Sequence, residues 1–216
     1  MDSARYIVVE GPIGVGKSTL AEKLANSLEA RLVLEETEAN PFLEGFRKDR
    51  KTYAFQAQLF FLLSRFRQLQ ELTQLDLFHR STVGDCLFER DRLFALVSLD
   101  EDEFHLYEQV YALLQVRVPT PDLVIYLSAR ADVLWQRHRA SGQEEGDFYS
   151  REYLEDLNEA FNHFFFHYGR SPLLVVNTSD VDLINSDEDY QHFLREVLTH
   201  RKGTKHYIPL SSAAVS

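Results

Sequence analysis

A single cysteine, Cys86, occurs among the 216 residues of the chain, so no intrachain disulfide can form. This composition favours a reducing compartment, and we expect a cytoplasmic protein. Long hydrophobic runs are also lacking. No apolar stretch approaches the ~20 residues that a membrane-spanning helix requires, so we expect no membrane partner. The first β-prone run begins almost at the N-terminus, which leaves no room for a signal peptide before it.

Basic residues are scarce as well, because 23 lysines and arginines stand against 34 aspartates and glutamates, for a net charge of −11. Polyanion binding normally uses a basic face, so this balance argues against nucleic acid as a partner. No internal repeat or low-complexity segment is present. Hydrophobic residues make up 44% of the chain, which is enough for the core of one large domain. We expect that domain at 1–201, followed by a C-terminal tail at 202–216 without apolar periodicity.

Short apolar runs separated by helical patterns indicate an α/β fold. The predicted strands cover residues 6–10, 32–34, 82–85, 123–127 and 173–176. The main helical patterns cover residues 51–74, 103–116, 131–139 and 149–168. Strands joined by helices predict a parallel five-stranded sheet with helices on both faces. Ligands bind outside the carboxyl ends of such strands, so the residues just past each strand are the candidates for a site.

The residues GPIGVGKS at 11–18 match the pattern of a phosphate-binding P-loop, between a β-prone run and an amphipathic helix. The glycines let backbone N–H groups converge on one anion, which also faces the positive end of the following helix. Lys17 would place its charge on the β- and γ-phosphates of ATP, and Ser18 would offer its hydroxyl to Mg²⁺. The predicted phosphate-binding residues are Gly11, Gly14, Val15, Gly16, Lys17, Ser18 and Thr19.

Carboxylates follow the second and third predicted strands. Glu35, Glu36 and Glu38 come after the second strand, where one of them can serve as the base or positioning group for an attacking hydroxyl. The alternative for these residues is an acidic helix N-terminus. Asp85 follows the third strand and can hold Mg²⁺ directly or through water, whereas its alternative role is a helix N-cap.

Basic and polar residues near these carboxylates are further candidates. Arg90, Asp91 and Arg92 follow the third strand, where arginine suits bidentate phosphate contact and a solvated charged turn is the alternative. In the first long helix, the Gln58 amide presents a donor and an acceptor that match the edge of a nucleobase. Arg65 lies seven residues further and shares its face of the helix. Gln56 cannot face the core together with Gln58.

Arginines also follow the fourth strand, before a segment flanked by Gly142 and Gly146. Arg130, Arg137 and Arg139 on such a segment suggest a lid that closes over the phosphates and excludes water. The alternative is an ordinary basic helix C-terminus, which the helix dipole favours.

With these residues assembled, the chain resembles the deoxynucleoside kinase family, and most closely its bacterial deoxyadenosine/deoxyguanosine kinase-like branch. Besides the P-loop, the likeness rests on LEETEANPFLEGF, AFQAQLFFLLSRFRQ, GDCLFERDRLFA, PDLVIYL and YLEDLNEAFNHFFFHY. The resemblance implies a P-loop nucleoside-kinase-like three-layer fold. It also implies transfer of the γ-phosphoryl of ATP to the 5′-hydroxyl of a deoxynucleoside, with a purine preferred and with Mg²⁺. A homodimer is implied too, for which the aromatic face around residues 104–114 offers apolar area.

The resemblance further implies roles in catalysis and metal binding. Glu36 would be the catalytic carboxylate, and Asp85 would lie near Mg²⁺ and the reacting hydroxyl together with Ser18. Lys17, Arg137 and Arg139 would stabilise the charge at the transferred group. The residues implied in nucleoside binding are Gln58, Arg65, Asp91 and one of Glu144 and Glu145, which falls near the sugar 3′-hydroxyl.

Five positions depart from the family's pattern. The departures are Thr37 for a proline, Arg47 for a sugar-binding tyrosine, Cys86 for an arginine, and Ser141 and Gln143 for two lid arginines. They leave the phosphate site intact and bear on the lid, the sugar contact and the catalytic rate. Two other functions therefore stay open. One is a nucleoside monophosphate kinase of the thymidylate type, in which Arg47 would face an acceptor phosphate, and the other is a nucleotide-binding protein that has lost catalysis.

Overall fold

The computed structural model describes residues 5–35, 39–72, 81–140, 149–179 and 181–208. The strands are β1 (Arg5–Glu10), β2 (Arg31–Val33), β3 (Ser81–Gly84), β4 (Leu123–Ser128), β5 (Leu173–Asn177) and β6 (Thr204–His206). The helices are α1 (Lys17–Leu28), α2 (Leu43–Lys48), α3 (Arg50–Leu72), α4 (Arg90–Ser98), α5 (Glu101–Gln115), α6 (Ala131–Ala140), α7 (Arg151–Phe166) and α8 (Asp187–Thr199). None of these helices is long and apolar enough to cross a membrane.

The sheet is parallel, as predicted, but it has six strands in the order β2-β3-β1-β4-β5-β6. The five predicted strands are confirmed, with their ends within one residue of those expected. β6 was not predicted because it is a short polar edge strand whose three residues are all exposed. Since β6 pairs with β5, part of the expected C-terminal tail completes the sheet.

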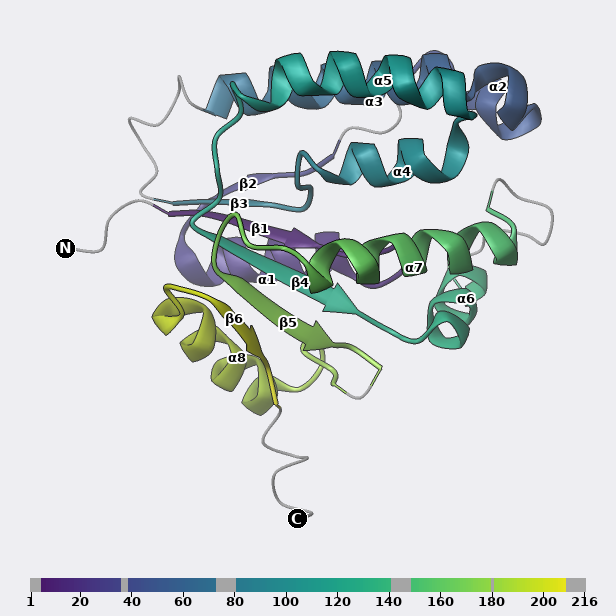
Figure 1. Cartoon of the computed structure of the whole chain (residues 1–216). Coiled ribbons are helices and arrows are strands. Elements are labelled where there is room, and N and C mark those ends of the chain that lie inside the picture. The colour runs from purple at the N-terminus through teal and green to yellow at the C-terminus, as the bar shows by residue number, and fades with distance from the viewer. Residues whose placement is uncertain (1–4, 36–38, 73–80, 141–148, 180, 209–216) are drawn as a thin grey trace.

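Helices cover both faces of the sheet, which confirms the three-layer arrangement (Figure 1). On one face, α1 and α8 pack against the strands through residues such as Leu24 and Phe193. On the other face, α4 and α7 do so through residues such as Phe161. β1 contributes to both cores, because Ile7 belongs to the first cluster and Val8 to the second. A strand buried on both faces is apolar throughout, which is the pattern read from the sequence.

α3 and α5 lie outside α4 and run along each other at the top of the molecule (Figure 1). They form a separate core in which Tyr107 and Tyr111 of α5 pack with Leu62 of α3. The aromatic face around residues 104–114 therefore packs largely within the protein against α3, which leaves less of it for a subunit contact than we expected. The most exposed apolar side chain of α5 is Leu113, which lies on the opposite side of the helix.

Candidate active site

The P-loop lies at the middle of the sheet's carboxyl edge, because β1 is paired with β3 on one side and β4 on the other. Gly11 has no room for a side chain, since an added Cβ would lie 2.3 Å from the carbonyl oxygen of Leu127 in β4. Gly16 has φ +99°, a conformation that residues with a Cβ rarely adopt, and it caps the N-terminus of α1. These two glycines let the loop turn tightly into the helix.

Lys17 lies inside the P-loop, where its Nζ donates to the carbonyl oxygens of Gly11 at 2.9 Å and Pro12 at 3.1 Å. Burial and the nearby Arg90 guanidinium lower the pKa of Lys17 to about 8, against the opposing influence of Glu10. A phosphate group bound in the loop would supply negative charge to this ammonium and favour its protonated form. The ammonium of Lys17 thus lies within the P-loop, and its contact with the phosphates of ATP stays a prediction.

Ser18 and Asp85 come together across the site. The Ser18 hydroxyl donates to Asp85 Oδ2 at 2.6 Å, and the other carboxylate oxygen accepts the backbone N–H of Glu35 at 2.8 Å. A hydroxyl and a carboxylate oxygen are the ligand types that Mg²⁺ uses in P-loop proteins, so this pair fits the predicted metal role. The alternative role of Asp85 as a helix N-cap is not observed, because α4 begins at Arg90 and its N-cap residue is Glu89.

A group of four charged side chains, the buried Arg65, Arg90 and Asp91 and the partly buried Glu35, lies next to Asp85. Arg65 donates from Nη2 to Glu35 and from Nε to Asp91 Oδ2 at 3.1 Å, while Arg90 Nη1 donates to Glu35 Oε2 at 2.5 Å. Burial alone would raise the pKa of Glu35, but Arg90 and Arg65 lower it to about 2, so the carboxylate is ionised. Burial raises the pKa of Asp91 in spite of Arg65.

This group decides between the alternatives for the residues after the third strand. Arg90 and Asp91 are buried, so they do not belong to a solvated charged turn. Arg92 instead points away from the group, because its guanidinium forms two hydrogen bonds with Glu108 of α5. On α3, Gln58 is only 2% exposed and Gln56 is exposed. The expectation that only one of these glutamines faces the core is confirmed.

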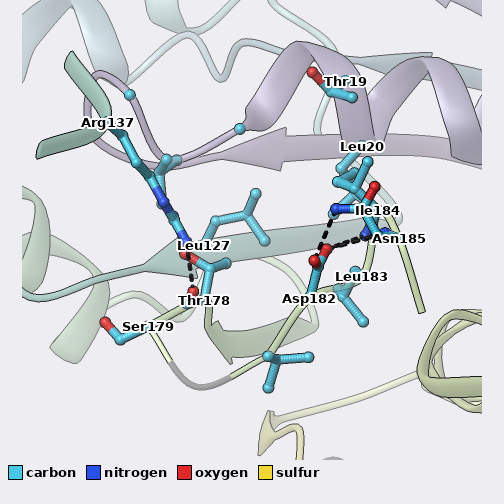
Figure 2. Close-up of a pocket in the computed structure, with 14 residues that line it drawn as sticks. Thr19, Leu20, Leu127, Arg137, Thr178, Ser179, Asp182, Leu183, Ile184 and Asn185 are labelled. Carbon is cyan, nitrogen blue, oxygen red and sulfur yellow. Dashed lines mark hydrogen bonds between the residues drawn. The ribbon is translucent and has the colours of Figure 1, made fainter. Parts of the chain in front are cut away.

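A cavity of about 620 Å³ opens beside the P-loop and is bounded by α6 and by the segment after β5 (Figure 2). Arg137 reaches into it from α6 and donates to the hydroxyl and the carbonyl oxygen of Thr178, at 2.9 and 2.8 Å. The cavity is lined by residues including Gly14, Val15, Gly16, Thr19, Arg137, Thr178, Asp182 and Asn185. Arg139 is exposed and is not among these lining residues.

Several residues of this region were not found from the sequence. Glu10 is completely buried, and its two carboxylate oxygens accept the backbone N–H groups of Gly11 at 2.8 Å and Leu87 at 2.7 Å. A glutamate at the end of a buried strand, directly before a P-loop, is the signal that could have identified it. The cavity lining at residues 178–185 was also missed, although it follows the carboxyl end of β5, where ligand sites are expected.

Seven sequence candidates or departures lie outside the described residues, so their roles stay predictions: Glu36, Thr37, Glu38, Ser141, Gln143, Glu144 and Glu145. Of the other departures, Arg47 is exposed on α2, and Cys86 is buried next to Asp85. The structure thus brings the P-loop, Asp85, Gln58, Arg65 and Asp91 to one region of the protein.

Similar sequences among known proteins belong to nucleoside kinases. The deoxynucleoside kinase family model matches residues 7–201 of the chain. The deoxyguanosine kinase of Bacillus subtilis (strain 168) is 32% identical over 158 residues, which cover 73% of this chain and 76% of that protein. The deoxyadenosine kinase of Lactobacillus acidophilus is 27% identical, with 89% of this chain and 94% of that protein covered.

Solved structures point the same way. The structure of deoxyadenosine kinase from M. mycoides with the products dCMP and a flexible dCDP bound has a TM-score of 0.72 at 26% identity. That similarity covers 89% of this chain and 96% of that one. Together with the family match over residues 7–201, these likenesses establish that the chain belongs to the deoxynucleoside kinase family.

Proposed function

We propose that the protein transfers the γ-phosphoryl group of ATP to the 5′-hydroxyl of a purine deoxynucleoside. The observation that carries this proposal is the position of Asp85, which accepts from the P-loop hydroxyl of Ser18 and from the backbone of Glu35. One side chain therefore joins a phosphate-binding loop to a buried polar group suited to a second substrate. The purine preference is supported by the names of the kinase relatives, which all include a purine deoxynucleoside, although one of them is a deoxyadenosine/deoxycytidine kinase.

ATP is the proposed donor, held by the P-loop and the adjoining cavity. The backbone of the loop and Lys17 would bind the β- and γ-phosphates. The cavity beside Gly14 and Arg137 has about 620 Å³, which leaves room for the nucleoside part of the donor. Arg137 would turn from Thr178 toward the transferred group. Ser18 and Asp85 would hold Mg²⁺, which supplies positive charge to the phosphates when bound.

The deoxynucleoside would bind on the α3 side of Asp85. Gln58 is proposed to pair with the base edge, because a buried amide needs a polar partner and offers a donor beside an acceptor. Arg65 and Asp91 are proposed to contact the base from the same side, with Arg65 fixed by its two carboxylate partners. One of Glu144 and Glu145 is proposed to accept from the sugar 3′-hydroxyl.

In the reaction, the 5′-oxygen forms a bond to the γ-phosphorus while the bond from that phosphorus to the bridging oxygen of ADP breaks. The hydroxyl proton passes to a carboxylate and then to solvent. The family resemblance assigns this carboxylate to Glu36, and the contacts of Glu35, which the sequence had also put forward, make it a second candidate. With a pKa of about 2, Glu35 would orient the hydroxyl rather than take its proton early, which suffices for a loose transition state.

A coupled assay of ADP release tests the proposed function. The purified protein is given ATP and Mg²⁺ with each deoxynucleoside, each ribonucleoside and each nucleoside monophosphate in turn. A purine deoxynucleoside should give the highest kcat/KM. A best substrate that is a monophosphate would favour the thymidylate-type kinase, with Arg47 facing the acceptor phosphate. Tight ATP binding without turnover on any of these compounds would favour the non-catalytic function.

We also propose a cytoplasmic homodimer. The family relation suggests the dimer, and an apolar groove of about 690 Å³ between α4 and α7 is our candidate contact surface. Leu93, Leu96 and Phe164 are among its lining residues, and Leu96 is 52% exposed. Light scattering on the purified protein measures the assembly. The cytoplasmic location rests on the single buried thiol of Cys86, which suits a reducing compartment.

A further inference from the structure

Arg90 is a buried arginine that lies close to both the P-loop lysine and Glu35. It is the first residue of α4, and only 10% of its side chain is exposed. Its Nη1 donates to Glu35 Oε2 at 2.5 Å, and its guanidinium carbon lies 5.0 Å from the centre of the Phe94 ring. After burial, Arg90 has the largest influence on the lowered pKa of Lys17. The guanidinium is therefore held in place and lies close to the P-loop lysine.

The hydrogen bonds of Arg90 differ from those of Arg65. Arg65 uses two of its nitrogens, Nε for Asp91 and Nη2 for Glu35. In the ranges that the structure describes, Arg90 donates a hydrogen bond only from Nη1, so the N–H groups of its Nε and Nη2 form no hydrogen bond within the protein. Neither nitrogen is among the buried polar atoms without a partner in the described residues, so both can be reached by an anion bound in the site. A phosphoryl group suits these donors, because its oxygens match the planar guanidinium.

We propose that Arg90 is a catalytic residue that donates from Nε and Nη2 to the phosphoryl group while that group passes from ATP to the deoxynucleoside. The proposal rests on the proposed function, since it needs a phosphoryl group moving from the P-loop toward the Glu35 side. No bond or proton changes hands at Arg90. Its charge and donors stabilise the oxygens of the phosphoryl group as the bond to ADP breaks and the bond to the 5′-oxygen forms.

The fixed geometry of Arg90 suits this role. Glu35 binds one edge of the guanidinium and Phe94 packs near it. The side chain is therefore already fixed before the reaction, and no free energy is spent on ordering it in the transition state. Arg137, in contrast, forms its hydrogen bonds with Thr178 in the cavity beside the P-loop, which Arg90 does not line. The two arginines would then contact the phosphoryl group from different sides. Such a contribution is worth about 10³-fold or more in kcat.

Arg90→Met is the first test, because methionine keeps much of the apolar stem and removes the charge. We expect kcat to fall about 10³-fold, with the KM for ATP and for the deoxynucleoside changed much less. Arg92→Met is the matched control, since Arg92 lies on the same helix and pairs with Glu108 outside the site. It should keep kcat near the wild-type value. Guanidinium chloride at millimolar concentration should partly restore the activity of Arg90→Ala.

A transition-state mimic separates a direct contact from a supporting role. Aluminium fluoride, which mimics the phosphoryl group in transfer, should raise the affinity of the wild type for ADP and the best deoxynucleoside. Arg90→Met should lose this gain while it still binds ADP. Arg90→Met combined with Glu35→Gln should also be slower than Glu35→Gln alone, because Arg90 acts on the phosphoryl group itself. A double variant no slower than Glu35→Gln would show that Arg90 only holds Glu35, and would overturn the proposal.

The failure of this inference differs from the failure of the proposed function. If the wild type phosphorylates no deoxynucleoside, the proposed function is wrong and the role of Arg90 falls with it. If the wild type is active and a folded Arg90→Met variant keeps near-normal kcat, only the inference about Arg90 is wrong. Circular dichroism and thermal unfolding establish that the variant is folded.

Discussion

The most direct test of the acceptor side replaces Gln58, which is 2% exposed and shares a face of α3 with Arg65. Gln58→Leu keeps a similar volume and removes the donor and the acceptor together. Polar groups of a bound base would then lie unpaired in a buried place, at a cost of about 1–3 kcal/mol. This range corresponds to a rise of about 5- to 150-fold in the KM for the best deoxynucleoside. The KM for ATP should change little, since its proposed cavity lies on the other side of the P-loop.

Gln56→Leu is the matched control, because the same substitution two residues earlier falls on an exposed face of the same helix. Steady-state kinetics with each substrate varied in turn measures both variants. The free energy of unfolding should not fall in Gln58→Leu, since leucine replaces a buried polar side chain. Equal effects of the two substitutions on the nucleoside KM would refute the assignment of Gln58 to the base. A best substrate that is a pyrimidine would contradict the purine preference.

Four further outcomes are expected. Lys17→Ala should keep the fold and lower kcat about 10³-fold or more, because the negative charge of the phosphates loses the lysine ammonium that stabilises it. Near-normal ATP-dependent turnover would contradict this. Glu36→Gln should lower kcat about 10²–10⁴-fold with little change in nucleoside affinity, and a comparable loss seen only in Glu35→Gln would move the catalytic carboxylate to that residue. Arg137→Ala should lower kcat sharply, whereas Ser141→Arg should leave kcat unchanged or raise it; a silent Arg137→Ala in an active enzyme would reduce that arginine to a helix-terminal charge. The pKa of Glu35 lies at about 2 in the fold, below its ordinary value of 4.5, so its contribution to stability is present above pH 4.5 and is lost as the pH falls toward 2. Urea unfolding at a series of pH values should therefore show a weaker acid dependence in Glu35→Gln than in the wild type.

Most of the sheet could be predicted because its strands carry local signals. Parallel strands buried on both faces must be apolar, and the five apolar runs were recognisable for that reason. β6 has no such signal, since Thr204–His206 is exposed and depends on hydrogen bonds to β5. The aromatic face of α5 had a clear local signal, but that signal did not identify the partner of the face. Helical spacing revealed an apolar stripe but did not say whether α3 or a second subunit covers it.

The candidate site also has features that local spacing predicted and others that only the folded structure shows. Spacing along one helix placed Gln58 and Arg65 together, and the structure agrees with that face. Arg90 was weighed equally as a phosphate ligand and as a solvated turn residue, because burial cannot be read from a charged tripeptide. Its ion pair with Glu35 joins the end of β2 to the start of α4, two elements that only folding brings together. The same holds for the hydrogen bond between Ser18 and Asp85.

By itself, the sequence determined the P-loop, the parallel α/β sheet and the order in which functional residues follow the strands. These features depend on backbone freedom at glycine, on apolar runs and on helical spacing, all of which act over a few neighbouring residues. The tertiary structure alone decided that Glu35 is ionised between two arginines and that Arg90 faces the site while Arg92 does not. Burial and charge pairing depend on residues 26 to 55 positions apart in the chain, so only the packed fold brings these groups within hydrogen-bonding distance.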